Sequence, residues 1–176
     1  MRVMVVIVLA ALAGVLGAQG PAGDGLGGAK RDGVGSGGRT SDAARFVVCD
    51  VMVESGGVGL GAWQVECVGS VRGDAKGRVE LVGVEGGEAG VYEKPAWYDP
   101  EALSHERVVI GAFSTEKGER LPRGKTRVAR LHLRVVGGDA GVGNQNVEMR
   151  VKVMAAGDAA GKTIEATATA VIQEAP

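Results

Sequence analysis

The sequence has few aromatic residues, few histidines and almost no net charge. Of its 176 residues, 3% are aromatic, two are His, and the formal net charge is -1 at pH 7. A basic surplus is the electrostatic signature of proteins that bind nucleic acid or acidic membranes, and this chain has none. Its length suits one domain and a tail.

The sequence also lacks the motifs of catalysis, cofactor binding and metal binding. Its Gly-rich run has neither the GK[ST] ending of a phosphate loop nor the spaced acidic residues of a calcium loop. His105 and His132 share no zinc-ligand spacing with each other or with the cysteines. No nucleophile-elbow sequence is present, and the acidic residues are scattered over turns and outer strand faces. We therefore predict a protein that is not an enzyme, with no cofactor and no metal site.

The N-terminal residues 1–18 have the outline of a secretory signal peptide. A single basic residue, Arg2, precedes an unbroken apolar run that ends in the small residues Gly17 and Ala18. This pattern predicts cleavage after Ala18. The alternative is an uncleaved membrane anchor, although the apolar run is shorter than the ~20 residues of a membrane span. We expect a secreted protein, extracellular or in the periplasm or cell envelope, with no membrane insertion after cleavage.

Residues 19–45 predict a flexible linker. They carry Gly, Ser, Asp, Lys and Arg and almost no large apolar side chains. Such a segment cannot bury enough surface to offset the entropy lost on ordering. The folded domain is therefore expected at residues 46–174.

The clearest strand is predicted at residues 125–136. Its residues alternate between an apolar face and a polar face, which is the pattern of a β-strand with one side in a core. The apolar face carries Ala129, Leu131, Leu133 and Val135, and the polar face carries Arg130, His132 and Arg134. This basic stripe either faces solvent or meets an acidic partner.

The same alternation recurs in six further segments. They cover residues 46–53, 61–68, 78–85, 107–114, 146–155 and 163–173. In the third segment Val79, Leu81 and Gly83 are expected on one face. Between the segments, Asp99 followed by Pro100 predicts a helical turn at 100–103. The pattern favours an all-β antiparallel sandwich or jelly roll with seven to nine strands.

Two cysteines lie on predicted strands that flank one Gly-rich turn. Cys49 and Cys67 both fall on the apolar faces. Outside the cell such a pair is a candidate disulfide, and in a simple hairpin the two residues would lie opposite each other. The alternative is two buried free thiols that pack as small apolar groups.

The longest irregular segment, residues 86–106, holds half of the aromatic residues. Tyr92, Trp97 and Tyr98 lie there among prolines. Their flat rings are candidates for stacking on sugars, and functional residues often lie on loops. The alternative is that the loop folds these rings over one open end of the sandwich. Trp63, in contrast, is predicted to lie in the core.

Residues 44–174 resemble a cohesin-type module of the cohesin and carbohydrate-binding jelly-roll superfamily. The resemblance rests on GAWQVECV, VELVGVEGGE, YDPEAL, RVVIGAFST and LPRGKTRVARLHLRV. It implies non-catalytic binding, either of a calcium-loaded dockerin-like protein module or of a polysaccharide. It places Gln64 and Glu66 on a partner-facing sheet, and it places the two cysteines in different sheets, so that a disulfide would cross the core. A structural component of a surface assembly is the third alternative.

Overall fold

The structure, a computed structural model, describes residues 44–73, 77–137 and 146–173. By internal contacts the chain divides into Met1–Thr40 and Ser41–Pro176, and all described residues belong to the second unit. The predicted signal peptide and nearly all of the predicted linker lie outside the described residues. In the described part of the chain, no helix has the length and apolar character needed to cross a membrane.

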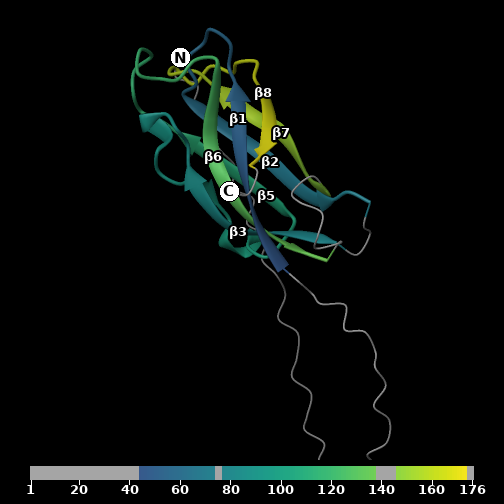
Figure 1. Cartoon of the computed structure of the whole chain (residues 1–176). Coiled ribbons are helices and arrows are strands. Elements are labelled where there is room, and N and C mark those ends of the chain that lie inside the picture. The colour runs from purple at the N-terminus through teal and green to yellow at the C-terminus, as the bar shows by residue number, and fades with distance from the viewer. Residues whose placement is uncertain (1–43, 74–76, 138–145, 174–176) are drawn as a thin grey trace, which may run out of the picture. The chain divides into compact units, whose positions relative to one another are not determined.

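The described residues form two antiparallel four-stranded sheets that pack as a sandwich (Figure 1). This confirms the predicted fold class. One sheet has the order β3-β6-β1-β8 and the other has the order β4-β5-β2-β7. The strands are β1 (Ala44–Glu54), β2 (Ala62–Val71), β3 (Arg78–Gly86), β4 (Trp97–Tyr98), β5 (Arg107–Phe113), β6 (Lys125–Val136), β7 (Val147–Gly157) and β8 (Thr167–Ile172).

The strand β6 lies between β3 and β1 at the centre of its sheet, with the two faces that its alternation predicts. Leu131 and Leu133 pair across the sheet with Cys49 and Val47 of β1. The four apolar residues of β6 are at most 2% exposed. Because β-strand side chains alternate strictly, burying these four residues directs the charged residues between them to the outer face.

The predicted alternation of β3 is wrong beyond Leu81. Leu81 is paired with Leu133, but the next paired residue is Gly83, opposite His132. Val82 is therefore the extra residue of a β-bulge, and it is 40% exposed. A bulge shifts every later residue to the other face. As a result Val84, not Gly83, packs against the core.

The last predicted strand divides between the two sheets. Thr163 forms a bridge with Gly157 of β7, and the Ile164 N–H donates to the Ala156 carbonyl at 3.0 Å. The chain then crosses to the other sheet, where β8 pairs with β1. The predicted apolar face is nevertheless partly buried against the core: Ile164, Ala166, Ala168, Ala170 and Ile172.

The loop between β3 and β5 contains two 3₁₀ helices and β4. The helix η2 (Pro100–Ala102) occupies the predicted helical turn, and the Asp99 carboxylate accepts the Glu101 N–H at 3.0 Å. The helix η1 (Gly90–Tyr92) and β4 were not predicted. Such short elements show no measurable periodicity in a sequence.

Candidate functional site

Three strands bring the candidates Trp97 and Gln64 into one row on the outer face of the sheet β4-β5-β2-β7. Trp97 lies opposite Gly111 of β5, and Gly111 lies opposite Gln64 of β2. Directly opposed residues of antiparallel strands share a face. Trp97 is 56% exposed. Because Gly111 has no side chain, the indole and the amide stand on either side of an open position.

Two further exposed apolar residues extend this face. Phe113, opposite Ala62, is 69% exposed, and Met154, at the bulge of β7, is 51% exposed. We call the surface formed by Trp97, Phe113 and Met154, with the small residues Ala62, Gly111 and Ala155 between them, the Trp97 patch. Neither Phe113 nor Met154 was a candidate from the sequence. The signal for Phe113 was its place in the predicted strand 107–114, where alternation puts it on the face opposite to the buried Val108 and Ile110.

Charged residues border the Trp97 patch. The Arg107 guanidinium contacts the Glu66 carboxylate through Nε at 2.7 Å and through a terminal nitrogen at 2.7 Å. Lys152 of β7 lies opposite Glu66 on its other side. The candidate Glu66 is therefore on the predicted sheet face, where it belongs to the polar border of the patch.

The candidate Tyr92 lies in the core. It is 2% exposed, its hydroxyl donates to the Leu60 carbonyl at 2.6 Å, and its ring meets the Trp63 ring edge to face. Burial raises the pKa of Tyr92 to about 12. The candidate Tyr98 lies opposite the buried Ile110 and packs against the core. Of the three loop aromatics, Trp97 alone is mostly exposed to solvent, because η1 and β4 fold the two tyrosines inward.

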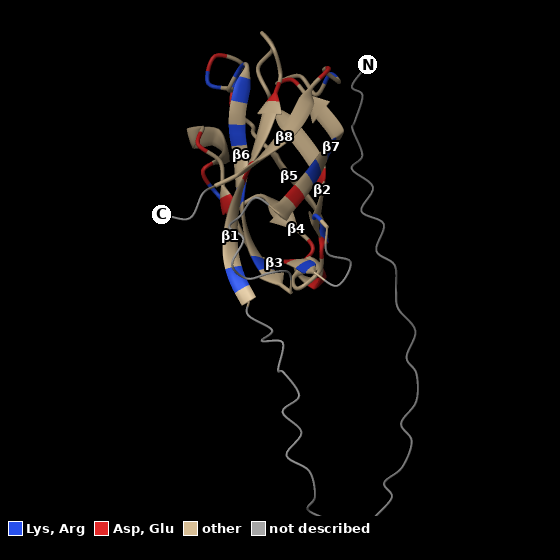
Figure 2. Cartoon of the chain, turned by 45° about the vertical axis from the view of Figure 1, so that its right-hand side comes forward, with Lys and Arg blue, Asp and Glu red and all other residues tan. Residues whose placement is uncertain are grey.

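The strands of the other sheet carry charged residues of both signs (Figure 2), and on its outer face these residues pair with one another. Each residue of the predicted basic stripe contacts a carboxylate on a neighbouring strand: Arg130 with Asp50 at 2.7 Å, His132 with Glu85 at 2.8 Å, and Arg134 with Glu80 at 2.8 Å. The hydrogen bond from Arg130 holds the pKa of Asp50 below its ordinary value. The stripe is thus engaged within the chain, as expected of a solvated sheet face.

Both cysteines are fully buried free thiols. Cys49 is on β1 and Cys67 is on β2, and these strands belong to different sheets, so the simple hairpin arrangement is wrong. Burial raises the pKa of each thiol to about 12, and the next cause for Cys67 is its proximity to Cys49. The two thiols therefore both lie in the core, one from each sheet. A disulfide between them stays a prediction.

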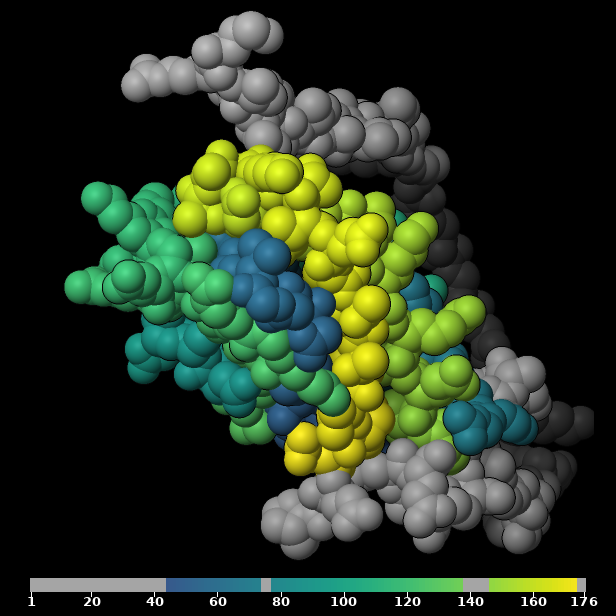
Figure 3. Space-filling view, turned by 90° about the horizontal axis from the view of Figure 1, so that it is seen from above, coloured from purple at the N-terminus to yellow at the C-terminus, as the bar shows by residue number. Residues whose placement is uncertain are grey.

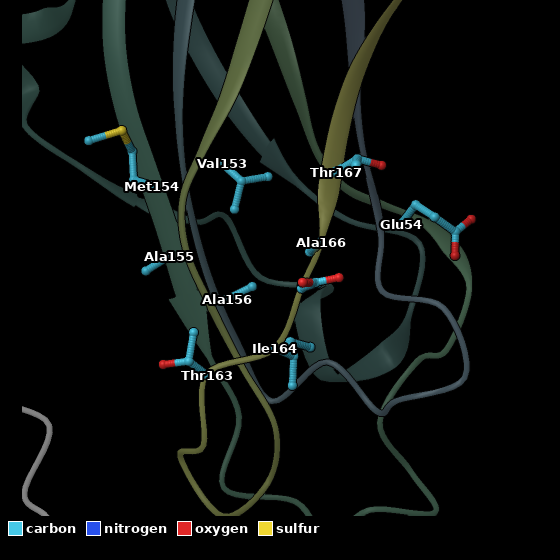
Figure 4. A pocket seen from close by; sticks show the side chains of 10 residues that line it. Glu54, Val153, Met154, Ala155, Ala156, Thr163, Ile164, Ala166 and Thr167 are labelled. Carbon is cyan, nitrogen blue, oxygen red and sulfur yellow. The ribbon is translucent and has the colours of Figure 1, made fainter.

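An open groove of about 540 Å³ runs between the outer edges of β7 and β8, which lie side by side in Figure 3 (yellow-green and yellow). Its lining is mostly apolar. Figure 4 shows the residues that line the groove on its β7 side and on its β8 side. They are Glu54, Val153, Met154, Ala155, Ala156, Thr163, Ile164, Glu165, Ala166 and Thr167. Met154 lies at the edge of the groove, and its side chain points away from Val153 and Ile164.

No group of three or more His, Cys, Asp or Glu residues in the described ranges could hold a metal ion. No protein-family model matches the chain, and neither a curated protein nor a solved structure matches it. The all-β sandwich is the part of the cohesin-type resemblance that the structure supports.

Proposed function

We propose that this chain is a secreted, non-catalytic binding module that recognises a protein partner through the Trp97 patch. The observation that carries the proposal is the composition of the patch. Trp97, Phe113 and Met154 are exposed around small residues, with the Glu66–Arg107 pair at the border. Protein interfaces are enriched in Trp, Phe, Met and Arg, and they surround an apolar centre with a polar rim.

The outer face of the other sheet is less suited to binding a partner than the Trp97 patch. Its central charges are neutralised by cross-strand pairs within the chain, such as Arg130–Asp50 and Arg134–Glu80. Binding a partner there would require breaking those pairs, which costs free energy that a partner must restore. The apolar side chains of the Trp97 patch have no such internal partners to lose.

The test is affinity capture with matched variants. The secreted chain is immobilised and exposed to the secreted and envelope proteins of its source, with calcium and then with a chelator. We expect a captured protein whose affinity falls about 30-fold or more in Trp97→Ala or Phe113→Ser, since central aromatic residues contribute about 2 kcal/mol or more. Phe46→Ser is the control, because Phe46 is 71% exposed on the other sheet. Equal losses in all three variants would contradict the proposal.

Calcium dependence identifies the kind of protein partner. A captured protein that carries paired calcium loops and is released by chelator would support dockerin-like recognition by a cohesin-type module. A captured protein that is retained in chelator would support the Trp97 patch as a protein-binding face of another kind.

Polysaccharide binding is the second candidate, and the Trp97 indole favours it. The ring is 56% exposed at an edge strand, beside Gly111, which has no side chain to cover it, and exposed aromatic rings can stack on sugars. Retention on insoluble polysaccharide that Trp97→Ala abolishes, without a change in melting temperature, would establish it. Self-association of the purified chain, lost in Phe113→Ser, would instead support a structural role in a surface assembly.

Secretion has its own test. We expect the chain in the culture medium or envelope to begin at residue 19, after cleavage at Ala18. N-terminal sequencing decides the matter, and an intact N-terminus in a membrane fraction would support the uncleaved anchor.

A further inference from the structure

The strands β7 and β8 leave neighbouring edges without a strand partner. β7 pairs with β2 on one side, and β8 pairs with β1. On the other side of β7, the described residues contribute the Gly157–Thr163 bridge and the Ile164–Ala156 hydrogen bond. Beyond Ile164 the chain moves away from β7 toward the other sheet. Among the described residues, the edge of β7 at Val153–Ala155 therefore has no hydrogen-bonded strand partner, although β8 packs close beside β7, and this edge borders the groove.

The groove is chemically asymmetric. Val153, Ala156, Ile164 and Ala166 give it an apolar lining, and Glu54 and Glu165 add carboxylates on the β8 side (Figure 4). Glu54 accepts the Gly56 N–H at 2.9 Å. Neither carboxylate has a cationic partner among the residues that the structure describes, whereas Asp50, Glu66, Glu80 and Glu85 all have one. The groove thus complements a ligand that combines an apolar group with a positive charge.

The charges on β7 argue against a second copy of the same strand as the occupant. Arg150 and Lys152 are exposed residues on the same edge strand. Pairing β7 with an antiparallel β7 of another copy would bring these cations close to their counterparts. Charged residues on edge strands commonly prevent such self-pairing. The uncharged part, Val153–Ala155, remains open to a different strand.

We propose that this groove binds an extended peptide segment of a partner protein, which adds as a strand to the free edge of β7. An apolar side chain of the peptide enters the groove over Ile164 and Ala166. A Lys or Arg at the neighbouring position lies at the rim of the groove, from which its long side chain reaches Glu165 and Glu54. Backbone hydrogen bonds supply affinity, and the alternation of apolar and basic side chains supplies specificity. This site borders the Trp97 patch, with which it shares Met154 and Ala155, but it does not depend on the function of that patch.

The experiment titrates the secreted chain with three short synthetic peptides and follows its backbone amide NMR signals. In the peptides valine alternates with lysine, with serine or with glutamate. We expect the lysine peptide to shift the amides of Val153–Ala156 and Thr163–Thr167, and to bind more tightly than the serine peptide. The glutamate peptide should not bind. No shifts in these segments with any peptide, or equal affinity for the lysine and glutamate peptides, would overturn the proposal.

Variants separate the groove from a general charge effect. Glu165→Gln should weaken the lysine peptide about threefold, as expected for an exposed ion pair, and Glu165→Lys about tenfold or more. Glu106→Lys is the matched control, because Glu106 is exposed and precedes β5 at the opposite end of β2 from the groove. Ala166→Leu should block the groove and abolish the amide shifts while leaving the fold intact by circular dichroism. Equal weakening by Glu106→Lys and Glu165→Lys would also contradict the proposal.

Discussion

The rings of Trp63 and Tyr92 meet edge to face, with centroids 5.9 Å apart and an interplanar angle of 83°. Trp63 is an inward residue of β2, and Tyr92 ends the 3₁₀ helix η1. The Tyr92 hydroxyl donates to the carbonyl of Leu60, which is itself buried. This contact anchors the loop after β3 onto the end of the core. It also fixes the segment from which β4 presents Trp97.

Replacing Tyr92 tests how strongly this anchor holds. Tyr92→Phe removes the hydroxyl and leaves the buried Leu60 carbonyl without its donor, so we expect the free energy of unfolding to fall by about 1–2 kcal/mol. Tyr92→Ala also removes the ring and should cost about 3–5 kcal/mol. Chemical denaturation measures both values. A loss below about 0.5 kcal/mol in Tyr92→Phe would show that water satisfies the carbonyl equally well.

Two glycines near this loop differ in the space around their Cα atoms. A Cβ at Gly86 would lie 1.9 Å from the Glu93 carbonyl oxygen, whereas a Cβ at Gly90 would meet nothing within 4 Å. Gly86→Ala must therefore displace backbone, and we expect a destabilisation above about 2 kcal/mol. Gly90→Ala is the matched control. It should change the free energy of unfolding by less than about 1 kcal/mol, because an added Cβ there meets no other atom. Similar melting temperatures for the two variants would contradict this expectation.

The strands were predictable because each buries one face, and burial imposes a period of two on the residues. The alternation of β6 gave its buried face from Ala129 to Val135, but it missed Thr126 and Val128, which are buried on the other side of a register shift. What the alternation does not contain is the identity of each strand's neighbour. The placement of Cys49 and Cys67 in different sheets depends on pairings such as Cys49↔Leu131, between residues far apart in the sequence. For the same reason, the partner of His132, Glu85, could not be predicted.

The bulge in β3 and the crossing after Ile164 escaped prediction for a different physical reason. Both are local departures from regular pairing within segments whose composition stays strand-like. Of the site residues, Trp97 and Gln64 were candidates, but the register that places them beside Gly111 comes only from the pairing of β4, β5 and β2. The inward position of Tyr92 depends on η1, a single turn that has no periodic signature.

The ion pairs around Asp50 make stability depend on pH at the acidic end. Arg130 donates to both carboxylate oxygens at 2.7 and 3.1 Å, and Gln173 donates at 2.8 Å. The pKa of Asp50 is therefore lower in the folded chain than its ordinary value of 3.8. A depressed carboxyl pKa stabilises the fold above the ordinary value, and this contribution is lost as the pH falls through the folded pKa.

Asp50→Asn should accordingly destabilise the chain by about 2 kcal/mol at pH 7, and this difference should shrink below about pH 4. Denaturation of both proteins across this range measures the difference. Glu165→Gln is the control, because the Glu165 carboxylate has no ion-pair partner in the described part of the chain, and its stability should follow wild type throughout. A constant deficit in Asp50→Asn from pH 7 to pH 3 would show that its cause is packing, not charge.

The two core thiols make stability depend on pH at the alkaline end. The ordinary pKa of a thiol is 9.0, and burial raises the pKa of both Cys49 and Cys67 to about 12 in the folded chain. Between these values the folded state retains two protons that the unfolded state releases. Stability is therefore fully present below about pH 9 and falls as the pH rises, by about 1.4 kcal/mol per pH unit for each thiol.

Comparing reduced and oxidised chains turns this pH dependence into a test of the predicted disulfide. The reduced wild type should lose stability steeply above pH 9. The double variant Cys49→Ala, Cys67→Ala should lose much less. Tyr92, whose pKa is also raised in the folded chain, adds to the loss in both proteins only above about pH 10. A disulfide has no thiol protons to lose. If the two thiols oxidise, the chain should therefore show the shallow slope until reductant is added, together with about 3 kcal/mol of extra stability at neutral pH. A steep slope with and without reductant would show that the thiols stay free and would contradict the predicted disulfide.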